Sequence, residues 1–279
     1  MNHSLSKEVD QVKTAVGRYV LRFHDERDHI YGQVKSTRDF YESAMLKALL
    51  PLLAQGDFVV DVGANVGNHA VFFAGEAKCR VLAIEPVAVT HELLVKNIES
   101  NGLEESIYPR EFGLGDSSGF ARAEQIDNTN LGATQLSASD SRDDIVVRRM
   151  DSLPEILVNN VRLIKVDVEG MEVEVLRGAH GVIVRDLPFI VCECQTEADF
   201  RVVFEHLSSY GYMPLDCFNA TPTYLFVPQE WKAGNSYTRV DYVADAVFRS
   251  SVQRQRLQHE LALLRRQVAR LEIGLSHDA

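Results

Sequence analysis

The chain has 279 residues, 46% of them hydrophobic and 25% charged, so it can fold around a core as one α/β domain with an appendage or as two small domains. A net charge of −11 argues against a nucleic-acid partner held by phosphate contacts. Apolar runs such as 189–192 are too short to span a bilayer, and the charged N-terminus has no signal-peptide pattern, so we expect a cytoplasmic protein without an integral membrane segment.

Predicted strands and helices alternate over most of the chain. The first 39 residues are polar and mixed, with weak helical periodicity and no catalytic signature. After a helix at 42–54, we expect strands at 58–62, 80–84, 107–114, 145–150, 163–167 and 189–193, helices at 66–76, 87–100, 153–158, 172–178 and 197–209, and an antiparallel pair at 211–218 and 223–227. The stretch 115–140, rich in Gly, Ser, Asp and Asn, is predicted to be a hairpin-bearing excursion. This alternation predicts an α/β fold with a parallel sheet covered by helices on both faces.

The last thirty residues carry a different pattern. Leu257, Leu261, Leu264, Val268 and Leu271 are spaced by 4, 3, 4 and 3 residues, which is the seam of a short coiled coil. We therefore divide the chain into an N-terminal extension at 1–39, a main domain at 40–243 and a C-terminal helix at 244–279. That helix is expected either to dock on the main domain or to join two copies into a homodimer, and contact with anionic lipid is a minor alternative.

The segment 58–69 is the most informative part of the sequence. An apolar strand ends in Asp61, and Gly63 and Gly67 form a turn that leads into a helix. The spacing Gly-x-x-x-Gly differs from the Gly-x-Gly-x-x-Gly pattern of dinucleotide sites, and an acid at the turn would repel phosphate and favour an ammonium. Glu85, at the end of the next predicted strand, is placed to accept hydrogen bonds from two ribose hydroxyls. A nucleoside cofactor with a cationic group and no phosphate fits this pattern, which favours S-adenosylmethionine over NAD.

The chain resembles the FkbM-type methyltransferases from about Phe40 to Pro228. The motifs that carry the resemblance are the segment from Asp61 to Gly67, Ile84-Glu85-Pro86, Gly113-Leu114-Gly115-Asp116, the segment from Ile164 to Glu172, and Val175-Leu176-Arg177-Gly178-Ala179. The resemblance implies a class I, Rossmann-like fold with a seven-stranded sheet, a reversed final hairpin and S-adenosylmethionine-dependent methylation, usually of a hydroxyl oxygen. One departure is visible, since the residue after Gly67 is often aromatic in the family and is Asn68 here, followed by His69.

The resemblance also implies which residues bind the cofactor. By position in the motifs, the methionine moiety would be held by Asp61, Gly63 and Asn65 in the turn that ends at Gly67. Glu85, followed by Pro86, would bind the ribose, and Leu114 would lie near the adenine. Glu42 matches an acidic position that precedes the first motif in many members, and is expected to contribute to cofactor binding.

Three acids and one histidine are the candidates for catalysis. A hydroxyl acceptor must lose a proton, and Asp167, Glu169 and Glu193 lie at or just after the ends of predicted strands, where a doubly wound sheet binds its ligands. His69, inside the helix after the glycine turn, is the fourth candidate. Two alternatives stay open: Glu169 caps the next helix while Asp167 only shapes the pocket, or the paired acids bind a divalent cation. We predict no metal site, and the four cysteines lack zinc-ligand spacing.

The acceptor is the least determined part of the prediction. Asn128, Asn130 and Thr134 in the excursion are candidates for its binding site, and a small-molecule or glycan-type acceptor is expected from the resemblance alone. Two other function classes stay open. One is a nicotinamide-dependent oxidoreductase, and the other is a non-catalytic interaction module that presents the C-terminal helix.

Overall fold

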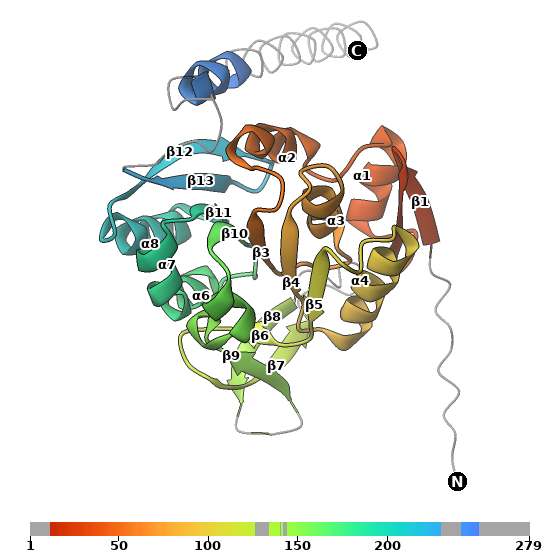
Figure 1. Cartoon of the computed structure of the whole chain (residues 1–279). Coiled ribbons are helices and arrows are strands. Elements are labelled where there is room, and N and C mark those ends of the chain that lie inside the picture. Colours follow the sequence, from red (N-terminus) through yellow and green to blue (C-terminus); the bar gives the residue numbers. More distant parts are fainter. Residues whose placement is uncertain (1–11, 126–133, 140, 142–143, 230–240, 251–279) are drawn as a thin grey trace, which may run out of the picture. The chain divides into compact units, whose positions relative to one another are not determined.

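A computed structural model describes residues 12–125, 134–139, 141, 144–229 and 241–250 (Figure 1). The chain forms two compact units, Met1–Gly234 and Asn235–Ala279. In the second unit residues 241–250 are helical, and the heptad positions from Leu257 to Leu271 lie outside the described residues. No helix within the described ranges has the length and apolar character needed to cross a bilayer.

The first unit is built on a seven-stranded sheet, as the resemblance implied. In spatial order its strands are β12 (Tyr212–Phe218), β13 (Thr223–Pro228), β11 (Phe189–Glu193), β10 (Val161–Val166), β3 (Phe58–Val62), β4 (Arg80–Ile84) and β5 (Ile107–Arg110). Strands β11, β10, β3, β4 and β5 run parallel, and β12 and β13 form the reversed hairpin at one edge. The chain order reverses between β3 and β10, and in such sheets the ligand crevice opens at the carboxyl ends of these strands.

Helices cover the sheet because both of its faces are apolar. All five residues of β3 are buried, which a strand with one solvated face would not show. Phe58, Val60 and Val62 belong to one core cluster that includes residues of α6 (Glu172–Gly178), α7 (His180–Asp186) and α8 (Glu197–Ser208). The remaining helices of this unit are α1 (His29–Thr37), α2 (Ser43–Leu49), α3 (Asn68–Gly75), α4 (Ala88–Ser100) and α5 (Pro154–Val158), with short 3-10 turns at Leu50–Leu52 and Met150–Ser152.

The excursion predicted at 115–140 contains the expected hairpin, formed by β7 (Gly119–Gln125) and β8 (Thr134–Ser139). This hairpin joins β9 (Ile145–Arg148) and β6 (Gly113–Leu114) in a separate four-stranded sheet. The strand predicted at 107–114 is therefore wrong as one element. Its first half is β5 of the large sheet and its last two residues pair with β9, because the chain turns at 111–112.

The N-terminal extension contains more structure than its sequence indicated. The helical structure that the weak periodicity indicated is wrong for residues 12–23. These residues form an antiparallel hairpin of β1 (Val12–Val16) and β2 (Tyr19–Phe23) (Figure 1). Burial alternates along β2, with Tyr19, Leu21 and Phe23 inside. Val20, on the outward side, is also apolar, so the sequence lacks the alternation that marks a half-buried strand.

Candidate active site

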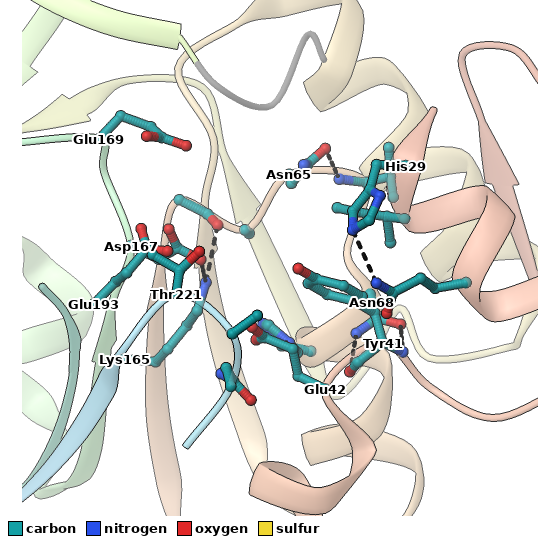
Figure 2. A pocket seen from close by; sticks show the side chains of 18 of the residues that line it. His29, Tyr41, Glu42, Asn65, Asn68, Lys165, Asp167, Glu169, Glu193 and Thr221 are labelled. Carbon is teal, nitrogen blue, oxygen red and sulfur yellow. Dashed lines mark hydrogen bonds and ion pairs between the residues drawn. The ribbon is translucent and has the colours of Figure 1, made fainter. Parts of the chain in front are cut away.

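A pocket of about 560 Å³ opens at the carboxyl ends of β3, β4, β10 and β11 (Figure 2). It is lined by residues from these strand ends, from α1 and α3, and from the loop before β13: His29, Ile30, Gln33, Tyr41, Glu42, Gly63, Ala64, Asn65, Val66, Asn68, His69, Glu85, Lys165, Asp167, Glu169, Glu193, Gln195, Asn219, Ala220 and Thr221. A smaller, mainly apolar pocket shares Gly63, Glu85, Asp167 and Glu169 with it and adds Pro86, Phe112, Leu114, Val168 and Met171 among others. Two compartments of different polarity thus share one boundary.

The two glycines of the predicted cofactor turn have different roles. Gly63 has φ 74°, and a Cβ there would lie 1.8 Å from the backbone oxygen of Asp167, so only glycine lets β3 and β10 approach at the pocket floor. Gly67 has φ 90° and begins α3, where a Cβ would meet Leu94 Cδ1 at 2.6 Å. Gly67 is not among the residues lining these two pockets, and its lack of a Cβ lets α3 pack against Leu94 of α4. Its contact with a ligand stays a prediction.

Backbone strain is concentrated around the larger pocket. Seven non-glycine residues in the described chain have positive φ, and Glu42, Asn65, Glu169 and Asn219 among them line this pocket. A side chain in this left-handed region costs free energy that the surrounding fold must offset, and such residues cluster at functional sites. Glu42 and Asn65 are two of the predicted cofactor residues, so their conformation agrees with a ligand site here.

Lys165 is the main site residue that the sequence interpretation missed. Its side chain is 3% exposed, and its ammonium lies 3.3 Å from Asp61 Oδ1 and 3.1 Å from Asp167 Oδ2. Burial would lower the pKa of Lys165, but the two carboxylates hold it above its usual value, so the side chain is charged. Asp61 is fully buried and lines neither pocket. Asp61 therefore pairs with a cation, as expected for an acid at this turn, but the cation is the Lys165 ammonium of the protein itself.

The catalytic candidates Asp167, Glu169 and Glu193 lie together on one side of the pocket (Figure 2). Burial raises the pKa of Glu193 to about 9, with a further contribution from the neighbouring Asp167 carboxylate. Burial would also raise the pKa of Asp167, but Lys165 reverses this and holds it below its usual value. Burial and the Asp167 charge raise the pKa of Glu169. The cluster thus combines one fixed carboxylate with two that hold protons more tightly than usual.

One oxygen from each of these acids lies within 4.8 Å of the others, close enough for the three to share a divalent cation. Acidic clusters are common without a cation, and the Lys165 ammonium already supplies positive charge beside Asp167. We therefore assign no metal to this cluster. The four cysteines are free thiols.

His69 is the fourth catalytic candidate, and the structure pairs it with a predicted cofactor residue. Its Nε2 atom lies 3.2 Å from Glu42 Oε2, and both side chains are largely buried. The Tyr41 ring stacks on the imidazole at a centroid distance of 6.4 Å. Asn68 fixes this segment, since its side chain accepts from the Tyr41 amide at 3.0 Å and donates to the Tyr41 carbonyl at 3.1 Å. The wall next to α3 is thus polar where the family is often aromatic.

Glu85 lies on the boundary between the two pockets. Its Oε2 accepts from the Asn65 amide and its Oε1 from the Val87 amide, each at 2.9 Å. Burial raises the pKa of Glu85 to about 7 although both hydrogen bonds favour the ionised form. Pro86 and Leu114 line the apolar pocket beside it, as the motifs implied. Of the predicted acceptor residues, Thr134 begins β8, while Asn128 and Asn130 lie outside the described residues.

Comparisons with known proteins identify a family for this chain. The family model described as the methyltransferase FkbM domain matches residues 61–214, more than half of the chain. The chain is 28% identical over 193 residues to the hexuronic acid methyltransferase AglP of Haloferax volcanii, a match covering 69% of this chain and 78% of that protein. It is 26% identical over 171 residues to the methyltransferase sdnD of Sordaria araneosa, covering 48% of this chain and 66% of that protein.

Among solved structures, the methyltransferase FkbM from Methylobacillus flagellatus KT is 20% identical, with a TM-score of 0.48. The match covers 63% of this chain and 44% of that chain, so less than half of that protein is represented. The family match and the curated relatives favour a methyltransferase over the nicotinamide-dependent oxidoreductase considered from the sequence.

Proposed function

This chain belongs to the FkbM methyltransferase family, and we propose that it transfers a methyl group from S-adenosylmethionine to a hydroxyl of a small-molecule or glycan-type acceptor. The observation that carries the proposal is the buried Glu85 carboxylate on the boundary of two pockets of different polarity. The apolar pocket with Pro86 and Leu114 suits an adenine, the acid suits ribose hydroxyls, and the polar pocket suits an amino-acid tail and an acceptor.

The chain offers suitable groups for each part of this cofactor. The turn from Gly63 to Asn65 brings backbone close to the pocket, and Glu42 and Asp167 present carboxylates that would attract an ammonium. Lys165 keeps Asp167 ionised, and the second ion pair of Lys165, with the buried Asp61, holds its ammonium in place. When bound, S-adenosylmethionine supplies a methyl group made electrophilic by its sulfonium. We assign Asp61 a positioning role, acting through Lys165.

We assign the general base to Glu193. A hydroxyl oxygen becomes a better nucleophile as its proton is removed, and a base with a raised pKa takes that proton more readily than an ordinary carboxylate. Burial and the adjacent Asp167 carboxylate raise the pKa of Glu193 to about 9, so Glu193 is a strong base in its ionised form, and the ionised fraction grows as the pH rises toward 9. Glu169 is then available to orient the acceptor. His69 is the second candidate, because Glu42 lies close enough to orient its ring.

Calorimetry with S-adenosylhomocysteine and with NAD tests the proposal. S-Adenosylhomocysteine should bind, and its affinity should fall as the pH drops below about 7, because protonated Glu85 accepts fewer hydrogen bonds from a ribose. Glu85→Gln should weaken binding and remove this pH dependence. Glu92→Gln, at an exposed position on α4, is the matched control and should change neither. Binding of NAD without S-adenosylhomocysteine would overturn the proposal.

The remaining organisation stays a prediction. We propose an extension at 1–39, a methyltransferase domain at 40–243 and a helix at 244–279 through which two copies associate. We also propose a cytoplasmic location and, from the net charge of −11, no nucleic-acid partner.

A further inference from the structure

Residues 28–42 lie before the family match, which begins at residue 61, yet they supply one wall of the larger pocket. The hairpin that precedes them is fixed to the sheet domain by Asn97 of α4 and by Asn101, which caps the C-terminus of that helix. Asn97 accepts from the Arg22 amide at 2.7 Å and donates to its carbonyl at 3.0 Å, and Asn101 makes the same pair of bonds to Val20, at 2.9 and 2.8 Å. Asn97 also donates to the Val66 carbonyl at 2.8 Å, which ties the hairpin to the glycine turn. The wall is therefore held in position by the methyltransferase core.

Helix α1 presents one side to this core and another to the pocket. Asp28 caps its N-terminus by accepting from the amides of Ile30 and Tyr31. Tyr31 and Val34 are buried, with Tyr31 against Phe23, while His29 and Gln33 line the pocket one helical turn apart.

The pocket side of this wall is largely polar and carries no lysine or arginine. The Gln33 amide nitrogen lies 2.9 Å from His29 Nε2. The rings of His29 and Tyr41 are nearly perpendicular, with their centroids 6.2 Å apart. Burial raises the pKa of Tyr41 to about 12, so its hydroxyl remains a donor at neutral pH. Amide, imidazole and phenol groups can both donate and accept, which matches the hydroxyls of a polyol.

The charges across the pocket limit which acceptor can enter. Opposite the wall are Asp167, Glu169 and Glu193, and Glu42 is the pocket-lining acid of the wall itself (Figure 2). Lys165 is the only lysine or arginine among the described lining residues, and Asp61 and Asp167 already pair with it. A carboxylate or phosphate on the acceptor ring would thus face the Asp167, Glu169 and Glu42 carboxyl groups, while the lysine beside them is already paired.

We propose that residues 28–42 form the acceptor-recognition wall and that the methylated ring is a polyhydroxylated sugar with no acidic group of its own. This inference rests on the proposed function and deepens it. It separates this chain from its relative in Haloferax volcanii, whose named acceptor is a hexuronic acid.

A labelling experiment identifies the charge of the methylated ring directly. Source-cell extract is incubated with the protein and methyl-labelled S-adenosylmethionine, the products are hydrolysed to monosaccharides, and these are separated on an anion exchanger. We expect at least ten times more label in sugars that pass through than in sugars that bind. Equal or greater label in the bound sugars, or none in either pool while S-adenosylhomocysteine still binds, overturns the inference. Loss of S-adenosylhomocysteine binding would instead contradict the proposed function.

Two variants on α1 test the wall itself. Gln33→Ala should raise the apparent KM for the extracted acceptor about three- to tenfold, as expected for one lost neutral hydrogen bond, and leave the Kd of S-adenosylhomocysteine unchanged. Ser36→Ala, at an exposed position of the same helix that does not line the pocket, should change neither value. An unchanged KM for Gln33→Ala, or a change confined to the cofactor Kd, would refute the assignment.

Discussion

Replacing Lys165 by methionine should destabilise the protein strongly, although methionine is close to lysine in size. The ammonium lies between Asp61, which is fully buried, and Asp167, whose side chain is 34% exposed. In the variant, Asp61 keeps its carboxylate in the sheet interior without its cation partner. Removing one partner of a buried ion pair costs about 3–5 kcal/mol, because an uncompensated charge remains.

A second estimate gives a similar magnitude. A buried carboxylate without a cation partner can become neutral by binding a proton. For an ordinary aspartate with a pKa of about 3.9, this protonation requires about 4 kcal/mol of free energy at pH 7. Asp167 adds less, since water reaches part of its side chain. In the variant the folded state binds a proton that the unfolded state releases above about pH 4. The difference in stability from the wild type should therefore grow as the pH rises from about 4 to 7.

Urea unfolding followed by circular dichroism measures this effect at both pH values. Asp61→Asn added to Lys165→Met should recover most of the lost stability, because it removes the uncompensated charge. Lys47→Met removes a lysine from an ion pair with Asp39 whose side chains are 59% and 35% exposed, so this control should cost about 1 kcal/mol or less. A loss below about 1 kcal/mol for Lys165→Met at pH 7, or no recovery in the double variant, would refute the reasoning.

Three further predictions concern the base, the turn and the C-terminus. In the wild type, kcat/KM should rise with pH toward about 9 as Glu193 ionises. Glu193→Gln should abolish this rise, and Asp167→Asn should move it to lower pH. Unchanged pH profiles of kcat/KM in both variants would exclude Glu193 as the base. Gly63→Ala should unfold at much lower urea than Gly102→Ala, because its new Cβ meets the Asp167 carbonyl whereas nothing lies within 4 Å of Gly102; equal midpoints would contradict this. Deleting 250–279 should halve the mass measured by light scattering, and an unchanged mass would argue against the predicted dimer.

Sequence alone was sufficient for most strands of the sheet and for several residues that line the two pockets, because their signals are local. Period and length identify strands such as 58–62, and the glycine turn with Glu85 lies within one strand–helix–strand unit. Pro86 and Leu114 were found in the same way, from motifs at the ends of neighbouring strands. A lysine inside the apolar stretch 163–166 was the one available signal for Lys165, since a buried strand rarely holds an unpaired charge.

The tertiary structure decided which of these residues meet one another. Asp61 and Lys165 are 104 positions apart, and the register of β3 with β10 makes them neighbours, which gives Asp61 an ion-pair partner within the protein. The wall from 28 to 42, apart from Glu42, was missed for the same reason. Asn68 bonds Tyr41 within it, and Asn97 and Asn101 hold the hairpin that precedes it. Local patterns determine elements and motifs, whereas ion pairs, raised pKa values and pocket walls depend on contacts between distant segments, which no single segment encodes.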